Sequence, residues 1–217
     1  AAIERWGWYN RNAAINPYLV EGKKTVVLEL AEQLDWQMPD WLVLSVGDGC
    51  TIAGAGKGLQ DLKELGFIDK VPRLLGVQAS GCAPIFHSYC SGSELIPAEE
   101  NTLADSIAVG VPRNPHKAMC QVRHSQGVMV AVEDEEILAA MRLMGRTCGV
   151  FAEPASAAGL AGLARAVKEG LVEPDSEVAV ISTGNGLKDI ANALKAAGEP
   201  LRVAPDIDQL AQVLGEG

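Results

Sequence analysis

The fold is decided by residues 41–59, WLVLSVGDGCTIAGAGKGL. The first six residues form a short apolar run closed by glycines, which is typical of a strand buried on both faces. The segment from Ile52 to Leu65 continues as a helix, and Gly66 provides the usual stop signal. Strand, glycine-rich turn and helix therefore follow one another within 25 residues, 41–65.

The same alternation extends along the chain. Further buried strands are expected at 73–78, 127–132 and 177–183. Helical spacing or composition predicts helices within 16–34 and at 84–89, 133–144, 153–170, 186–198 and 206–214. Strands separated by helices must pair in parallel, because a parallel pair needs a crossover connection. No linker divides the sequence, so we expect one α/β domain over 1–217, a three-layer sandwich around a mostly parallel sheet.

Composition excludes several classes of function. The 217 residues include 18 basic and 28 acidic side chains, a formal net charge of −10. This balance disfavours binding to nucleic acid or to an anionic membrane surface. No apolar run approaches the roughly 18 residues of a membrane helix, and no signal peptide is visible. The five cysteines form no CxxC pair and the three histidines lack metal-ligand spacing, so we expect free thiols, no metal and a cytoplasmic protein.

The glycine loop after the first strand is a candidate anion site. Gly47 and Gly49 allow backbone N–H groups to approach an anion, and Cys50 and Thr51 open the helix, whose N-terminus carries partial positive charge. The segment matches neither the Walker A pattern nor the dinucleotide fingerprint, and Asp48 would repel a phosphate if it pointed inward. A tight strand-to-helix turn without a ligand is the alternative. The helix end would also lower the pKa of the Cys50 thiol.

A second glycine loop, ISTGNGLKD at 181–189, follows the last strand. In parallel sheets, ligands bind where strand carboxyl ends meet helix N-termini, so the two loops are expected at one edge. A hydroxyl of Ser182 or Thr183 could bind a ring nitrogen of a ligand, and as a neutral group it would not enforce protonation there. Capping of the next helix is the alternative interpretation. Arg113, His116 and Lys117 could likewise meet an anion or lie in a surface loop.

The two loops, together with NPYLVEGKKT (16–25), GVQASGCAPI (76–85) and FAEPASAAGLAGL (151–163), resemble the threonine synthase family. Its members are pyridoxal-phosphate enzymes of fold type II, and the matching part is their large domain. The resemblance implies that the cofactor phosphate is bound, mostly through backbone N–H groups, by residues 47–51, namely Gly47, Asp48, Gly49, Cys50 and Thr51. It also implies that Thr183 contacts the pyridine nitrogen and that Glu153 lies near the cofactor. The family's usual loop has Asn at positions 48 and 51, and often His at position 185.

The lysine that binds the cofactor covalently follows Ser-Phe in this family, and no lysine here follows Phe. Lys188 lies in the second loop, where the family has a different lysine. The resemblance therefore implies a truncated enzyme: the C-terminal portion of the large domain, without the small lobe or the lysine-bearing segment, and with no catalytic residue assigned. Such a chain should be inactive alone.

The resemblance also implies the reaction of the complete enzyme. A threonine synthase is a carbon–oxygen lyase that converts O-phospho-L-homoserine and water to L-threonine and phosphate, and a homodimer is expected. Two alternatives stay open at this point. One is another fold-type II enzyme, such as a threonine or serine dehydratase or a β-replacing synthase. The other is a catalytically dead interaction module.

Overall fold

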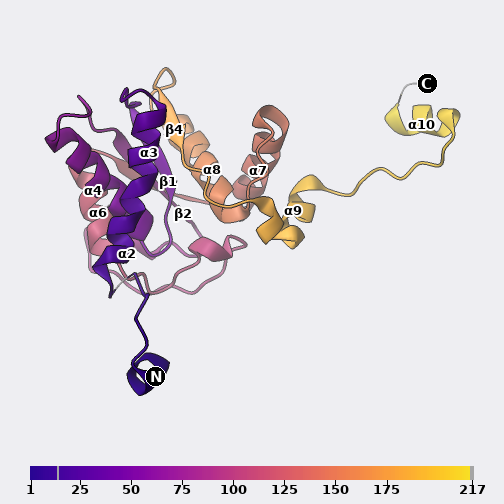
Figure 1. The fold of residues 1–217 in the computed structure, drawn as a ribbon. Helices are drawn as coiled ribbons and strands as arrows, with labels where there is room; N and C mark the ends of the chain where they lie inside the picture. Colours follow the sequence, from indigo (N-terminus) through magenta and orange to yellow (C-terminus); the bar gives the residue numbers. More distant parts are fainter. Residues whose placement is uncertain (14, 216–217) are drawn as a thin grey trace.

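The computed structural model describes residues 1–13 and 15–215 of the chain. Its centre is a parallel sheet (Figure 1), and the order of the strands across this sheet is β3-β2-β1-β4. The strands are β1 (Trp41–Ser45), β2 (Arg73–Ala79), β3 (Val128–Val132) and β4 (Val178–Val180). The sequence-based prediction of four parallel strands is confirmed. The last strand is shorter than expected, because pairing with β1 ends at Val180 and the chain continues as a loop.

One face of the sheet is covered by α3 (Thr25–Gln33), α4 (Cys50–Glu64) and α6 (Pro115–His124) (Figure 1). Leu42, Leu44 and Leu74 point to this side and form one buried cluster with α4 residues such as Leu59. Alternate residues of the same strands face the opposite side, as the period of two along a strand requires. Both faces are therefore apolar, which explains the continuous apolar runs in the sequence.

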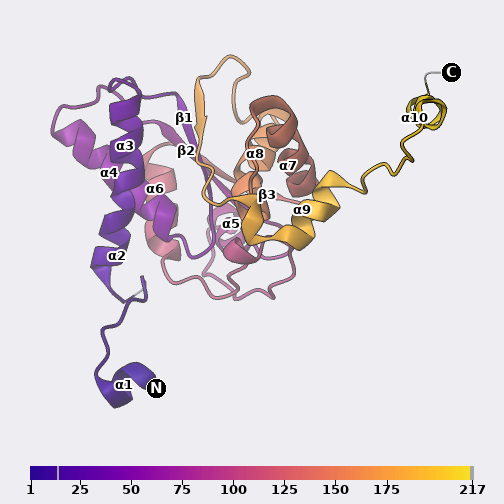
Figure 2. The same ribbon diagram turned by 45° about the vertical axis from the view of Figure 1, so that its right-hand side comes forward.

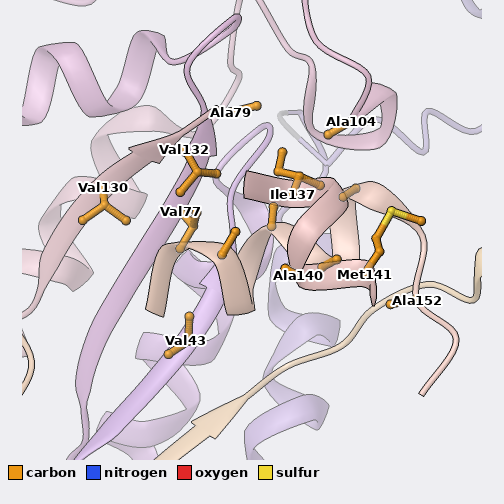
Figure 3. Close-up of a cluster of buried hydrophobic side chains, with 14 of the residues drawn as sticks. Val43, Val77, Ala79, Ala104, Val130, Val132, Ile137, Ala140, Met141 and Ala152 are labelled. Atoms are coloured by element: carbon orange, nitrogen blue, oxygen red, sulfur yellow. The ribbon is translucent and has the colours of Figure 1, made fainter. Parts of the chain in front are cut away.

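The other face is covered by α7 (Asp134–Cys148) and α8 (Pro154–Lys168). Figure 3 shows Val43, Val77 and Val130 of the sheet gathered with Ile137 and Met141 of α7. The sheet with helices on both faces is the expected three-layer sandwich.

The remaining elements lie around these layers. They are α1 (Ala2–Trp6), α2 (Pro17–Glu21), η1 (Gly22–Lys24), α5 (Pro84–Ser91), η2 (Asp105–Ile107), η3 (Gly186–Lys188), α9 (Ile190–Ala197) and α10 (Ile207–Leu214). In both views α1 and α10 extend away from the sheet layers, at opposite ends of the chain (Figure 2). All five cysteines are free thiols, as expected. In the described part of the chain, no helix is long and apolar enough to cross a bilayer.

Three details differ from the expected helices. The segment 16–34 folds as α2, η1 and α3 in succession, and 186–198 divides into η3 and α9. Residues 115–124, for which no helix was predicted, form α6, with Pro115 at its first position, where the missing N–H is not needed.

An ion-pair network ties η1 to α4. Asp61 accepts hydrogen bonds from Lys57 on its own helix and from Lys24, whose Nζ lies 2.9 Å from Oδ2. These contacts, first with Lys57 and then with Lys24, lower the pKa of Asp61.

Candidate functional site

A cavity of about 370 Å3 lies at the carboxyl end of β1, between the two glycine loops. Its walls come from the start of α4, from η2, from the start of α8 and from the loop after β4. All seven sequence-predicted site residues line it, namely Gly47, Asp48, Gly49, Cys50, Thr51, Glu153 and Thr183. The structure thus brings together residues more than 130 positions apart, and their roles remain predictions.

Gly49 forms the base of the glycine loop and precedes α4. Its φ is +83°, and a Cβ there would lie 2.8 Å from the Asn114 carbonyl oxygen and 2.9 Å from the Ala118 Cβ. Both the backbone conformation and the lack of space therefore favour glycine. The first N–H groups of the 15-residue α4 have no acceptor within the helix, so they can bind an anion in the cavity.

Asp48 is held by the loop before α6. Its Oδ1 accepts a hydrogen bond from the Arg113 N–H at 2.9 Å, and its carbonyl oxygen accepts one from the Asn114 N–H at 2.9 Å. The first bond holds the Asp48 carboxylate against the 113–114 backbone, and the second holds the Asp48 carbonyl group there.

Cys50 is buried beneath the loop. The Asn114 side-chain amide donates a hydrogen bond to its Sγ at 3.0 Å. Burial, followed by the nearby charge of Asp48, raises the pKa of the Cys50 thiol. The expected lowering of this pKa is therefore wrong, because burial disfavours the charged thiolate. Cys50 packs as an apolar residue with Val20 and Ala53.

The opposite wall carries a buried carboxylate. Glu153 is 4% exposed, and its Oε1 and Oε2 lie 3.0 Å and 2.8 Å from Lys188 Nζ. The hydrogen bond that Lys188 donates to Glu153 raises the pKa of Lys188, so this lysine is held protonated. Lys188 was not predicted as a site residue, although the TGNGLKD segment contains it.

Backbone pairing fixes the loop that carries Thr183. The Glu153 N–H donates to the Gly184 carbonyl at 3.0 Å, and the Gly186 N–H donates to the Phe151 carbonyl at 2.9 Å. A Cβ on Gly184 would overlap the Glu153 carboxylate, which explains the glycine at this position. Backbone hydrogen bonds therefore hold the loop against the segment before α8, and the position of Thr183 follows from this pairing.

The hydroxyls of this wall do not cap helices. Asn185 caps η3 and Asp189 caps α9, so the capping alternative for Ser182 and Thr183 is wrong. Among the described residues, the Thr183 hydroxyl has no hydrogen-bond partner, whereas Ser182 shares a bond with Ser156 at 2.7 Å.

Ser45, at the end of β1, also lines the cavity, and its buried Oγ has no partner in the described part of the chain. An orphaned buried hydroxyl is costly unless a ligand satisfies it. Ser45 was missed because nothing in its sequence context distinguishes it from other strand residues.

Comparison with known proteins agrees with this geometry. The family model described as "Pyridoxal-phosphate dependent enzyme" matches residues 1–184. The chain belongs to this family. Pyridoxal phosphate is a small anionic ring, and free helix-end N–H groups at one wall, with unpaired hydroxyls at the others, fit a phosphate and a ring nitrogen.

Similar curated proteins carry the name threonine synthase. The chain is 38% identical to the threonine synthase of Methanocaldococcus jannaschii, in a match that covers 94% of this chain and 51% of the relative. It is 41% identical to the threonine synthase of Methanosarcina acetivorans, in a match that covers 93% of this chain and 50% of the relative. The chain thus spans about half the length of these relatives, and it is a partial match to threonine synthase.

Solved structures show the fold-type II architecture. The threonine synthase of Escherichia coli has a TM-score of 0.67 at 18% identity, covering 94% of this chain and 50% of that one. The threonine deaminase isoform 2 of Solanum lycopersicum has a TM-score of 0.69 at 22% identity, covering 91% and 55%.

Proposed function

We propose that this chain supplies the cofactor-binding part of a threonine synthase, a pyridoxal-phosphate enzyme that converts O-phospho-L-homoserine and water to L-threonine and phosphate. Relatives at 38% and 41% identity bear this name, which favours it over the dehydratase and interaction-module alternatives. The observation that carries the proposal is that the glycine loop and Thr183 line the same cavity. We expect the complete enzyme to be a cytoplasmic homodimer.

The N-terminal turn of α4 binds the cofactor phosphate in this proposal. Gly47 and Gly49 shape the loop, and the N–H groups from Gly49 to Thr51 donate to the phosphate oxygens. Burial of Cys50 keeps its thiol neutral, so no second negative charge opposes the phosphate there.

The opposite wall orients the ring. The Thr183 hydroxyl, which has no partner in the described part of the chain, bonds to the pyridine nitrogen without enforcing its protonation. Glu153 acts through Lys188 and the 183–188 loop, and so positions Thr183. Pyridoxal phosphate, when bound, supplies an electron sink for the substrate.

The chain alone should be inactive. Lys188 is the lysine nearest to Thr183 in sequence, and its ammonium is occupied by a buried carboxylate that keeps it protonated. A protonated amine cannot act as a nucleophile. We therefore assign Lys188 a binding and orienting role and no covalent one.

A ligand series tests the proposal. Calorimetric titration with pyridoxal 5′-phosphate should show saturable binding, and pyridoxal, which lacks the phosphate, should bind far more weakly. Inorganic phosphate should compete. Thr183→Val should weaken binding of the phosphorylated cofactor and leave competition by inorganic phosphate unchanged, whereas Thr147→Val, an equivalent change on α7, should alter neither.

Two results would count against the proposal. Equal affinity for pyridoxal and its phosphate would exclude the glycine loop as the phosphate site. Release of phosphate from O-phospho-L-homoserine by the isolated chain with added cofactor would contradict its inactivity.

A further inference from the structure

A second cavity, of about 400 Å3, lies between α2, α4 and α6, and shares no lining residue with the first. Its size falls within the range of small-molecule pockets. We propose that it binds a small organic anion with an apolar body, such as an aliphatic carboxylate. The proposal is independent of the reaction assigned above.

The floor of this cavity is apolar. It is formed by the ring of Pro17, by Val20, which is 7% exposed, and by Ala53, which is 3% exposed. Val20 and Ala53 are part of a buried cluster with Cys50, so the floor is firmly packed from behind. An apolar surface of this kind favours a hydrocarbon group over water.

The rim of the cavity is cationic in a protein with a net charge of −10. Lys117 and His116 lie in the first turn of α6, where the helix end adds partial positive charge. Among the described residues, Lys117 forms no ion pair, whereas Lys57 is paired with Asp61.

The one acid of the rim is already engaged. Glu21 lies 2.5 Å from Lys24 Nζ and so does not neutralise Lys117. An unpaired cation beside an apolar floor is complementary to a carboxylate that carries a hydrocarbon chain, and a neutral or cationic ligand would leave Lys117 unmatched.

Cys120 provides a direct probe because its exposed thiol lines the cavity. Octanoate should slow the alkylation of Cys120 by iodoacetamide. Peptide mass spectrometry measures this rate. The alkylation rates of Cys90 and Cys148, which are exposed elsewhere, should not change. Octanamide has the same chain without the charge and should protect Cys120 much less. Equal protection of all three thiols, equal protection by both probes, or no protection would overturn the proposal.

A charge variant makes the test sharper. Lys117→Gln should weaken octanoate binding, measured as the concentration that half-protects Cys120, by about threefold, as for loss of one exposed charge contact. Lys168→Gln, at the exposed end of α8, removes the same charge elsewhere and should leave that concentration unchanged. Both side chains are exposed, so both variants should fold. Identical half-protection in the two variants would refute a site selected by charge.

Discussion

Replacing Gly49 with alanine should both destabilise the fold and impair the phosphate loop. The backbone at Gly49 has a φ of +83°, a conformation that costs a residue with a Cβ about 1–2 kcal/mol. The added methyl would also lie 2.8 Å from the Asn114 carbonyl oxygen and 2.9 Å from the Ala118 Cβ. Relief of such overlap requires backbone shifts that cost about 1–3 kcal/mol. We therefore expect Gly49→Ala to lose about 2–5 kcal/mol of unfolding free energy.

Gly66 provides a matched control at the other end of α4. Its φ is +76°, but a Cβ there would meet no atom within 4 Å. Gly66→Ala should therefore show the backbone cost alone, about 1–2 kcal/mol. The difference between the two variants isolates the packing of Gly49 against the start of α6.

Urea unfolding, monitored by far-ultraviolet circular dichroism, measures the unfolding free energy that each variant loses. Titration with pyridoxal phosphate measures the affinity of each variant for the cofactor. Gly49→Ala should bind the cofactor more weakly, and Gly66→Ala should bind it as the unmodified chain does. Equal destabilisation by the two substitutions would refute the packing argument. Equal cofactor affinity would refute the role of the loop in binding phosphate.

Three further predictions follow from individual side chains. Lys188→Met should lower the affinity for pyridoxal phosphate in calorimetric titration, because the buried Glu153 loses its counter-charge and the loop carrying Thr183 loosens; unchanged affinity would argue against this. The lowered pKa of Asp61 means that its stabilising effect is present above its ordinary value of 3.8 and is lost as the pH falls through the lower folded value. The Asp61→Asn variant should therefore lose less unfolding free energy between pH 7 and pH 3 than the unmodified chain does, as measured by urea unfolding. An equal loss in the two proteins would contradict the pairing. Burial and a raised pKa should make Cys50 react with iodoacetamide much more slowly than the exposed Cys148, and comparable rates would show that Cys50 is accessible.

The sheet could be predicted because its strands are buried on both faces. Such strands have uninterrupted apolar runs, and Trp41–Ser45 is a clear example, with neighbouring residues facing the two different cores. The end of β4 could not be predicted in this way. The apolar sequence continues to Ile181, but the loop that follows leaves the edge of β1 and pairs with residues 151–153. These partners are distant in sequence.

Helix α6 was missed because its sequence lacks a strong apolar stripe. Its buried residues are only Ala118, Met119 and Val122, and it lies in a polar stretch with prolines at 112 and 115. Its stability comes from packing against α4, where small residues allow close contact. A Cβ on Gly56, for example, would lie 2.6 Å from the Gln121 Cβ. Information of this kind is not present in the local sequence.

The meeting of the two glycine loops could be predicted where backbone geometry determines the residue type. Gly49 needs a positive φ, and Gly184 has no space for a side chain, so both glycines are visible in the sequence. Ser45 and Lys188 could not be recognised from the sequence, because their relevance depends on which side chains lie opposite them. The pKa of Cys50 was predicted in the wrong direction, because the helix end is a local feature and burial is a tertiary one.

The composition of α8 explains how the far wall of the cavity reaches the glycine loop. A Cβ on Gly162 would overlap Val77, and one on Gly159 would lie 3.3 Å from Val180 and 3.5 Å from Ser45 Oγ. The helix therefore lies closer to the sheet than larger residues would allow. Because α8 begins immediately after Glu153, this close approach places the carboxylate, and through it the Thr183 loop, beside the end of β1. The Ala- and Gly-rich sequence of α8 thus contributes to the shape of the site as well as to the core.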